Sequence, residues 1–409
     1  MADAVSIALV GIGGYGETYL RQLFEPPAGA PATRLVAAVD PVAPPEGWGR
    51  RELMARGIPL YADIDAMFAA RAPELVVISS PIPFHADQVC EVLKRGVPVL
   101  CEKPLCATIQ DARRMREAER RAGRFAAIGY QWSFSRAIQD LKRDVMSGAL
   151  GRPIRCRVMV LWRRTGVYYR RNNWAARLQT ADGRWVLDSP VHNATAHYLH
   201  NIFYVLGATR ETSDPPVEVT GELHRARPIE SFDTGALRCR THGGVEVLFY
   251  ATHSVAEHLD PAATFEFENA VVRCAERTFS ATFNDGTVRS YGAPDADGAR
   301  KLWDCVECAR TGAPVACGVA AATAEVLCVN GLHESVPAIA DIPPDLIEVT
   351  GEPGDQRVVV RGLAEALTAC YGKGVLPSEL GGLPWARPGR TVNLRGYEFF
   401  PSPGWPTAK

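Results

Sequence analysis

The chain has 409 residues, of which 47% are hydrophobic and 22% are charged, and its formal net charge is -1 at pH 7. These values are typical of a globular protein with two or three domains. They exclude the basic excess of a general nucleic-acid or anionic-membrane binder. The 11 cysteines are scattered, the N-terminus lacks a basic signal region, and no apolar stretch approaches the roughly 18 residues of a membrane-spanning helix. We therefore expect a cytoplasmic protein with reduced thiols.

The first 130 residues alternate short apolar runs with helical patterns. The runs cover residues 5–10, 35–39, 75–78, 98–101 and 125–128, and the helical patterns cover residues up to 24 and about 64–71, 85–95 and 108–122. Short buried strands that alternate with helices predict βαβ units in a doubly wound parallel sheet. We expect residues 1–130 to form a Rossmann domain of the α/β class.

From about residue 150 the pattern changes, and longer strands are predicted over 154–162, 217–223, 234–240, 245–252 and 263–274. Several of them alternate apolar and polar residues, which is typical of an antiparallel sheet with one buried face. Helices are expected at about 190–206, 299–311, 319–333 and 360–371, and the Pro- and Gly-rich tail from Pro384 is expected to lack regular structure. We predict a second α/β domain over 131–340 and a C-terminal extension over 341–409 packed on it.

A glycine motif, Gly11-x-Gly13-x-x-Gly16, follows the first predicted strand and opens a helix. In such a loop the first glycine permits a tight turn, the second lets a pyrophosphate approach the backbone, and the third lets helix and strand pack closely. The helix N-terminus then offers free N–H groups to phosphates. The predicted dinucleotide contacts in this loop are Gly11, Ile12, Gly13, Gly14, Tyr15 and Gly16.

Asp40 ends the second predicted strand. A carboxylate at this point accepts hydrogen bonds from the ribose hydroxyls of NAD, and its charge would repel the 2′-phosphate of NADP. Pro41 and Val42 follow, so no arginine stands beside it to hold that phosphate. We therefore predict NAD rather than NADP as the cofactor.

Further motifs follow the later strands of the predicted parallel sheet. They are Ser79-Ser80-Pro81 with His85, Glu102-Lys103-Pro104-Leu105, Gly129-Tyr130-Gln131 and Ser147-Gly148-Ala149-Leu150-Gly151. With the glycine loop and Asp40, their order and spacing resemble the Gfo/Idh/MocA family of oxidoreductases, named for glucose-fructose oxidoreductase and inositol dehydrogenase. The resemblance extends over about residues 5–335, and Ile82 departs from it where the family often has an asparagine that touches the cofactor.

The resemblance implies a Rossmann domain followed by an α/β domain with a large open, mostly antiparallel sheet. That sheet often packs against another subunit, so a homodimer or homotetramer is expected. The resemblance also implies that Lys103 of the Glu-Lys-Pro motif lies beside the substrate carbon. A lysine at the carboxyl end of a parallel strand does point into the crevice where ligands bind, and its ammonium could donate to a substrate oxygen or shuttle its proton. The other cofactor contacts implied are Ser79, Ser80, Pro81, His85, Glu102 and Gln131.

The family's second signature, Gly-Gly-x-x-x-Asp-x-x-x-His-x-x-Asp, fits residues 183–207 in either of two registers. One register keeps Asp188 and His192 four residues apart. The other places His197 at the family histidine, with Asn193 and His200 where the family has aspartates.

The expected start of the helix favours the second register. Ser189 followed by Pro190 is typical of a helix N-cap and first position, and from there Asn193, His197 and His200 would share one stripe. We therefore predict that His197 relays the proton and that Asn193 orients it or the substrate. Two histidines at this spacing could share a zinc ion, but the helix face lacks a third ligand, so no metal is predicted.

Residues 162–174 mix four arginines with four aromatic side chains. Such a run could stack on a sugar face or hold an acidic substituent, or it could form a surface loop or subunit contact. Within this run Trp174 is the strongest candidate for a site residue, because the resemblance places a tryptophan there near the nicotinamide. The further candidate substrate contacts are Trp174, Asp188, His192 and His200.

Together these features predict an NAD-dependent dehydrogenase that acts on a secondary alcohol of a sugar, sugar derivative or cyclitol. Lys103 and His197 would handle the hydroxyl proton. Two alternatives stay open: an NAD-dependent glycosidase that oxidises its substrate transiently, and a non-catalytic dinucleotide-binding regulator. Net formation of NADH separates the dehydrogenase from the glycosidase. The expected partner is a small polyol or sugar, with neither nucleic acid nor membrane involved.

Overall fold

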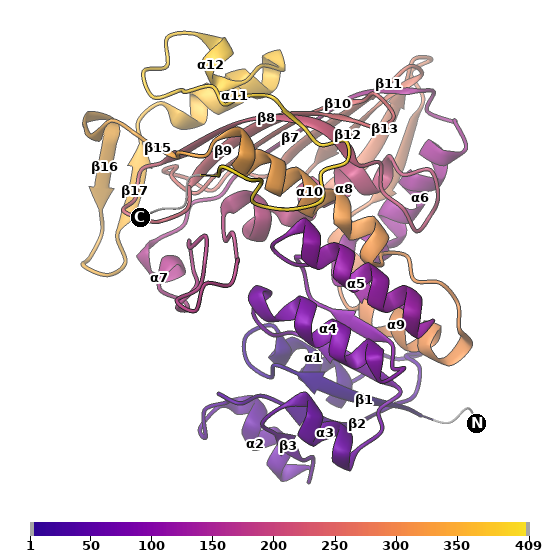
Figure 1. Cartoon of the computed structure of the whole chain (residues 1–409). Coiled ribbons are helices and arrows are strands. Elements are labelled where there is room, and N and C mark those ends of the chain that lie inside the picture. Colours follow the sequence, from indigo (N-terminus) through magenta and orange to yellow (C-terminus); the bar gives the residue numbers. More distant parts are fainter. Residues whose placement is uncertain (1–3, 406–409) are drawn as a thin grey trace.

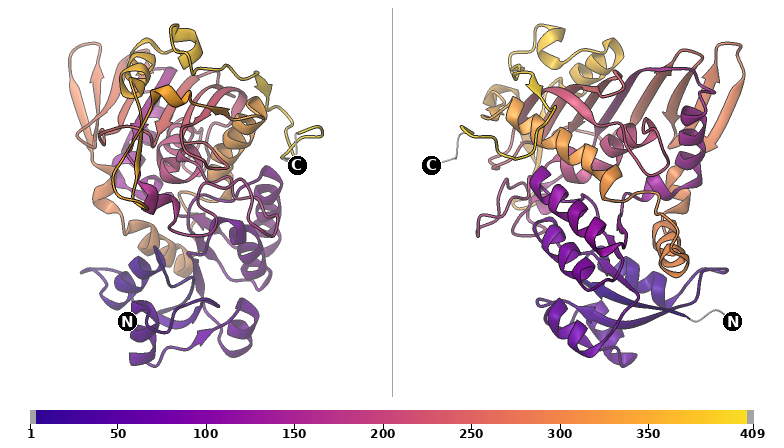
Figure 2. Two further views of the ribbon diagram at one scale, coloured as in Figure 1. Left: turned by 90° about the vertical axis from the view of Figure 1, so that its left-hand side faces the viewer. Right: turned by 45° about the vertical axis from the view of Figure 1, so that its right-hand side comes forward.

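The computed structural model describes residues 4–405, which form two large sheets with helices packed on them. In Figure 1 the first sheet and its helices, in indigo and purple, lie below the second sheet, and the C-terminal helices α11 (Leu363–Lys373) and α12 (Pro377–Leu380) lie above it. The two views in Figure 2 show the same stacking from other sides. Within residues 4–405, no helix combines the length and the apolar character needed to cross a membrane.

The N-terminal sheet is parallel throughout. Its strands are β1 (Val5–Val10), β2 (Thr33–Val39), β3 (Leu60–Tyr61), β4 (Leu75–Ile78), β5 (Val99–Cys101) and β6 (Ala126–Ile128), in the order β3-β2-β1-β4-β5-β6. The connecting helices are α1 (Gly16–Phe24), α2 (Trp48–Ala55), α3 (Ile64–Ala70), α4 (His85–Lys94) and α5 (Ile109–Ala122). The sequence carries the end signals: the Thr108 side chain caps α5 by accepting from Asp111 N–H, and Gly123 ends it with φ 60°.

The second sheet has ten strands and is mostly antiparallel, with parallel pairs only between β7 and β10 and between β8 and β15 within residues 4–405. Its strands are β7 (Pro153–Leu161), β8 (Pro216–Arg225), β9 (Thr234–Thr241), β10 (Glu246–Thr252), β11 (Ala262–Phe267), β12 (Ala270–Ala275), β13 (Thr278–Phe283), β14 (Val288–Gly292), β15 (Ala340–Asp341) and β18 (Val392–Asn393). A separate hairpin joins β16 (Ile347–Thr350) to β17 (Arg357–Val360). A parallel sheet followed by a large mixed sheet confirms the predicted fold class.

The remaining helices are α6 (Arg136–Met146), α7 (Gly166–Tyr169), α8 (Ala196–Val205), α9 (Arg300–Thr311) and α10 (Val319–Ser335). Of these helices, α6, α8 and α10 pack against strands of the second sheet, whereas α9 packs against β1 of the first. Along β7, Val158 and Val160 belong to the main core with α8 and α10, whereas Met159 and Leu161 pack with Leu367 of α11. Alternate residues of a strand point to opposite faces, so the chain's own C-terminal segment covers the middle of the outer face.

Three expectations from the sequence are wrong in detail. The strand predicted over 263–274 is a hairpin of β11 and β12, because Glu268 and Asn269 turn the chain between them. The helix predicted over 190–206 is broken: Pro190–Ala194 form one π-helical turn, and Thr195 separates it from α8. The tail from Pro384 is not wholly irregular, because it contributes β18, which pairs with β8.

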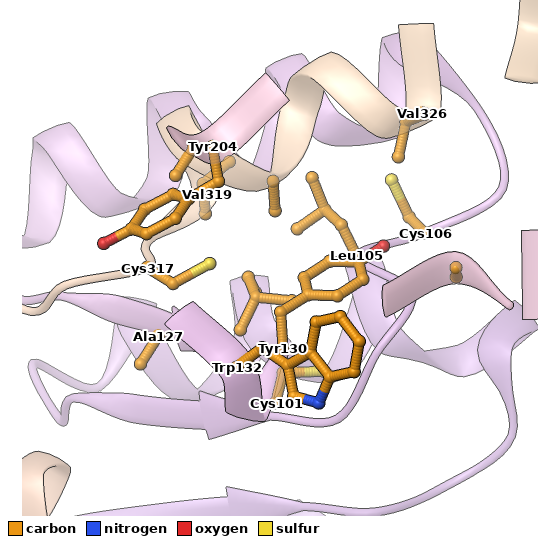
Figure 3. Close-up of a cluster of buried hydrophobic side chains, with 14 of the residues drawn as sticks. Cys101, Leu105, Cys106, Ala127, Tyr130, Trp132, Tyr204, Cys317, Val319 and Val326 are labelled. Carbon is orange, nitrogen blue, oxygen red and sulfur yellow. The ribbon is translucent and has the colours of Figure 1, made fainter. Parts of the chain in front are cut away.

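The two halves of the chain share one continuous core. Helix α10 packs on both α5 and β6, and the Ile128 N–H donates to the Cys317 carbonyl at 2.8 Å. The cluster drawn in Figure 3 lies at this junction and includes Cys101, Leu105, Cys106, Ala127, Tyr130, Trp132, Tyr204, Cys317, Val319 and Val326. The domain boundaries at residues 130 and 340 therefore stay predictions.

Candidate active site

A cavity of about 1010 Å³ lies at the carboxyl ends of the parallel strands and is lined by residues from both halves. This is the edge where doubly wound sheets bind their ligands. The predicted site residues that line it are Gly11, Gly13, Gly14, Tyr15, Asp40, Ser79, Ser80, Pro81, His85, Glu102, Lys103, Gln131, Trp174, Asn193 and His197. The predicted residues outside its lining are Ile12, Gly16, Asp188, His192 and His200.

The three motif glycines have different geometric reasons to be glycine. Gly11 has φ +81°, and a Cβ there would lie 2.9 Å from the backbone of Ser79 and Ser80. A Cβ on Gly16 would lie 2.1 Å from the carbonyl oxygen of Gly11, so α1 could not begin this close to β1. A Cβ on Gly13 would have no atom within 4 Å, so packing does not require this glycine. The open space at Gly13 belongs to the cavity and fits a group that approaches the backbone closely, such as a pyrophosphate.

Asp40 is held in place at the end of β2 by backbone donors. Its carboxylate accepts from the N–H groups of Ile12 and Val42, each at 3.0 Å. Ile12 thus contributes to the site through Asp40 and does not line the cavity. Two more carboxylates, Asp63 and Asp65, line the cavity at the start of α3, which makes this part of the wall acidic.

His85 braces the cavity wall. Its two ring nitrogens lie 2.9 Å from the carbonyl oxygens of Pro104 and Ser80, so the buried ring ties the turn after β5 to the end of β4. Burial lowers the pKa of His85. Because a neutral imidazole carries one N–H, the ring can donate to only one of these two carbonyl oxygens, and the cofactor contact that the resemblance implies stays a prediction.

Glu102 and Lys301 form a buried ion pair across the junction, with side-chain exposures of 9% and 1%. The carboxylate accepts from the Lys301 ammonium and, at 2.6 Å, from the Tyr19 hydroxyl. Burial by itself raises the pKa of Glu102, but Lys301 and the Tyr19 hydrogen bond lower it below its ordinary value. The charged Glu102 next to Lys103 is therefore stabilised by a helix, α9, that lies far away in the sequence.

Replacing Lys301 with methionine is expected to lower the free energy of unfolding by about 3–5 kcal/mol, because the change leaves a buried carboxylate without its partner. Chemical denaturation followed by circular dichroism measures the loss. Arg120→Met, which breaks an exposed ion pair with Glu117, is the control and should change the unfolding free energy little, because water and salt screen such pairs. Equal effects of the two substitutions would contradict a stabilising role for the Lys301 pair.

The Lys103 ammonium reaches Asn193, whose backbone carbonyl accepts from it at 2.8 Å and whose amide oxygen accepts at 3.2 Å. Burial lowers the pKa of Lys103, Glu102 raises it, and Lys301 lowers it again, so that the result lies below the ordinary value of a lysine. A lysine with a lowered pKa exchanges its proton more readily near neutral pH.

His197 lines the same part of the cavity. Its ring lies edge-on to Tyr130, with ring centroids 5.7 Å apart, and 6.4 Å from Trp132. Its Nδ1 is buried without a hydrogen-bond partner. Burial lowers the pKa of His197 well below its ordinary value, and the positive charges of Lys103 and Lys301 lower it further. The imidazole is therefore neutral at physiological pH and can accept a proton.

His192 and His200 were predicted to contact the substrate. The structure corrects this prediction, because it places both side chains outside the cavity lining. His192 Nδ1 lies 3.0 Å from Glu325 of α10, and both side chains are fully buried. His200 Nε2 lies 3.0 Å from the Ser133 hydroxyl. His200 lies three residues after His197 on the same helix, α8, but its ring is directed into the core, where it stacks on Tyr130 and faces Ser133 and Cys317.

Asp188 lies behind the cavity wall and is connected to it. Its carboxylate accepts from Arg171 Nη2 at 3.0 and 2.9 Å and from the Asn193 amide at 2.6 Å. Arg171 and Asn172 also line the cavity beside Trp174, and neither was predicted individually as a site residue. The available signal was the mixture of arginines and aromatic residues over 162–174. In the described part of the chain, no cluster of three His, Cys, Asp or Glu side chains could hold a metal ion.

Residues 5–130 match the model of a family described as an oxidoreductase family with an NAD-binding Rossmann fold, Gfo/Idh/MocA. An inositol 2-dehydrogenase of Streptomyces avermitilis is 33% identical over 155 residues, which are 38% of this chain and 44% of that protein. The rhizopine catabolism protein MocA of Rhizobium meliloti is 31% identical over 145 residues, 36% of this chain and 43% of that protein. The chain thus matches less than half the length of these two relatives.

Solved structures share the fold over a larger part of the chain. The WlbA dehydrogenase of Bordetella pertussis, in complex with NADH and UDP-GlcNAcA, has a TM-score of 0.66 at 22% identity and covers 81% of this chain and 96% of its own. The myo-inositol 2-dehydrogenase of Lactobacillus plantarum has a TM-score of 0.63 at 18% identity and covers 81% and 97%. Residues 5–130, with the glycine loop and the Glu-Lys-Pro turn, therefore match the Gfo/Idh/MocA oxidoreductase family, and the chain as a whole shares the fold of these dehydrogenase structures.

Proposed function

We propose that this protein is an NAD-dependent oxidoreductase that transfers hydride between the nicotinamide and a secondary hydroxyl or ketone of a sugar, sugar derivative or cyclitol. The observation that carries the proposal is a single cavity in which the glycine loop and Asp40 are joined by Lys103, Asn193 and His197. When bound, the cofactor supplies the hydride acceptor or donor, and the protein has to bind the substrate and move one proton.

Two residues are suited to move that proton. Lys103 has a lowered pKa and His197 is neutral, so one can donate to the substrate oxygen while the other accepts its proton. Asn193 holds the Lys103 ammonium through two acceptors. The inositol 2-dehydrogenases among the relatives support a cyclitol or sugar as the substrate class.

The charges of the cavity favour NAD over NADP. Three carboxylates, those of Asp40, Asp63 and Asp65, line the part of the cavity at the end of β2 and the start of α3. The two cations of the lining, Lys103 and Arg171, are instead connected to Asn193, directly and through Asp188. A 2′-phosphate beside Asp40 would meet repulsion without a compensating cation.

The same charges favour an uncharged substrate. Arg171 is the natural candidate to bind a carboxylate or phosphate, but its Nη2 already contacts both oxygens of the buried Asp188. Its guanidinium also lies 5.3 Å from the centroid of the Trp174 ring, and a tryptophan beside the cavity suits the apolar face of a sugar or cyclitol ring.

The predicted assembly and compartment belong to this proposal as well. We propose a cytoplasmic homodimer or homotetramer that uses the second sheet. Because Tyr371 of α11 reaches Thr264 of β11 at 2.7 Å, the outer face of β12–β14 is the part that α11 leaves for such a contact. We also propose that the chain divides into domains over 1–130 and 131–340, with a C-terminal extension over 341–409.

A coupled assay tests the function directly. Purified protein is incubated with NAD or NADP and a panel of neutral cyclitols and hexoses, uronic acids and sugar phosphates, and nicotinamide absorbance is followed. We expect NADH to accumulate with a neutral compound, at a rate at least about tenfold above that with NADP. Release of a leaving group without net NADH would favour the glycosidase. Failure of every compound, together with no dinucleotide binding by calorimetry, would defeat the proposal.

A further inference from the structure

The Asp188 carboxylate is buried behind the wall of the candidate active site. It contacts two residues that line the cavity, Arg171 and Asn193. Its residue exposure is 2%, yet it accepts four hydrogen bonds: two from Arg171 Nη2, one from the Asn193 amide at 2.6 Å, and one from the Ala176 N–H at 2.6 Å. Hydrogen bonds to an ionised acceptor are about twice as strong as those between neutral groups. Because Asp188 accepts hydrogen bonds from Arg171, Asn193 and the Ala176 backbone, it holds these three groups in one arrangement.

The contact with Asn193 determines which way that amide points. An ionised carboxylate only accepts hydrogen bonds, whereas an amide has a donating and an accepting end. With Asp188 on one side, the Asn193 Nδ2 must face it, and Oδ1 must face Lys103, whose ammonium only donates. The flipped amide would bring two acceptors together at 2.6 Å and turn an N–H group toward the ammonium. Asp188 therefore selects the orientation in which the Asn193 amide oxygen joins its backbone carbonyl in holding Lys103.

The backbone around Asp188 is shaped to place it. Leu187, which precedes it, has φ 50°, and Ala176, whose N–H donates to it, has φ 55°. Residues with a Cβ avoid this left-handed region, and such strain persists mainly at functional sites. The π-helical turn that carries Asn193 begins two residues after Asp188. Three unusual backbone features thus converge on one carboxylate that does not itself line the cavity.

We propose that Asp188 is a positioning residue of the reaction: it orients the Asn193 amide and through it holds the Lys103 ammonium at a fixed point of the cavity wall. This inference rests on the proposed function. Asp188 acts through Asn193, and its second partner, Arg171, anchors the carboxylate through contacts with both of its oxygens. Among the charged and titratable groups around Lys103, namely Glu102, Lys301, Asp188, Glu325 and His197, Asp188 is the one joined to it through a shared amide.

Exchanging the side chains of Asp188 and Asn193 tests whether Asp188 positions Lys103 or only stabilises the fold. Asp188→Asn is expected to lower kcat about 10- to 100-fold with KM changed less than about threefold, because the charged acceptor is lost but the shape is kept. Asn193→Asp alone brings two carboxylates together and should lower kcat at least as much. In the double variant Asp188→Asn/Asn193→Asp, an amide again donates to a carboxylate across the same 2.6 Å contact. We expect its kcat to recover at least about tenfold over the poorer single variant.

The pH profile provides the readout that a purely structural role would not move. Asp188 raises the pKa of Lys103, so removing its charge in Asp188→Asn should shift the Lys103-dependent limb of the kcat profile to lower pH. Asp182→Asn is the matched control, because this exposed carboxylate of the same loop contacts Arg184 and lies outside the cavity lining. It should leave kcat, the pH limb and thermal unfolding unchanged.

Two outcomes would overturn the proposal. One is an Asp188→Asn variant with the wild-type kcat and pH limb. The other is a loss of kcat that the double variant does not recover while the pH limb stays in place, which would make Asp188 a support of the fold only. If the wild-type protein turns over no compound of the panel, the proposed function fails separately. The ammonium of Lys103 can then be titrated by NMR of ¹⁵N-lysine protein, and an unchanged pKa in Asp188→Asn would still refute the inference.

Discussion

Replacing Lys103 with methionine is expected to lower kcat for the best neutral substrate by about 10²- to 10⁴-fold, the range that a positioned acid or base contributes. Methionine keeps the length and apolar stem of lysine but cannot donate to a substrate oxygen. It also leaves the acceptors of Asn193 without their ammonium. Steady-state kinetics at several pH values measures the loss, and calorimetry with NADH shows whether the cofactor still binds.

The control for this substitution is Lys94→Met, which removes an exposed lysine from the end of α4. It should keep kcat within about threefold of the wild-type value, because most surface substitutions change little. Wild-type kcat in Lys103→Met would show that the lysine is not part of the chemistry. Loss of NADH binding in Lys103→Met would show that the lysine serves the cofactor rather than the substrate.

The second large effect concerns the glycine loop, where Gly13→Ala and Gly16→Ala should fail in different ways. At Gly13 the added methyl group meets open space within the protein, so folding stability should be unchanged while NAD affinity falls at least about tenfold. At Gly16 the methyl group would lie 2.1 Å from the Gly11 carbonyl oxygen. The backbone must move there, so both thermal stability and NAD affinity should drop.

Thermal unfolding with and without NAD, together with calorimetric titration, distinguishes the two variants. Gly372→Ala in α11 is the matched control, because its Cβ would also have no atom within 4 Å and it lies far from the cavity. It should keep NAD affinity unchanged. Unaltered NAD binding in Gly13→Ala would contradict the assignment of this loop to the pyrophosphate, and unaltered stability in Gly16→Ala would contradict the close packing of α1 on β1.

The glycine loop was predictable because its chemistry is local. A left-handed turn at Gly11 and a close approach at Gly16 depend on neighbours within a few residues or on the next strand of the sheet. The apolar runs were predictable for the same reason: β1 and β4 are fully buried, and strands buried on both faces are nearly continuous apolar runs. These local signals were enough for the fold class and for the edge of the sheet at which the site lies.

The choice between His192 and His197 could not be made by spacing, because each stands four residues after a residue that could serve as its polar partner. The structure distinguishes them through contacts that no local pattern contains. Glu325 of α10 pairs with His192 in the core, and the π-helical turn shifts the phase of the chain. The helical stripe grouped His200 with His197, but the His200 ring faces Ser133 in the core and lies outside the cavity lining.

Periodicity and turn chemistry act over a few residues, so the parallel sheet, the glycine loop, the acidic residue after β2 and the lysine after β5 could all be predicted. Which charges meet depends instead on how distant elements pack. Lys301 reaches Glu102 across 199 positions of the chain, and Asp188 connects Arg171 to Asn193 behind the cavity wall. The tertiary structure also decided that α11 covers the outer face of the second sheet. Burying a charge requires a partner, and the packing of distant elements determines which partner is within reach.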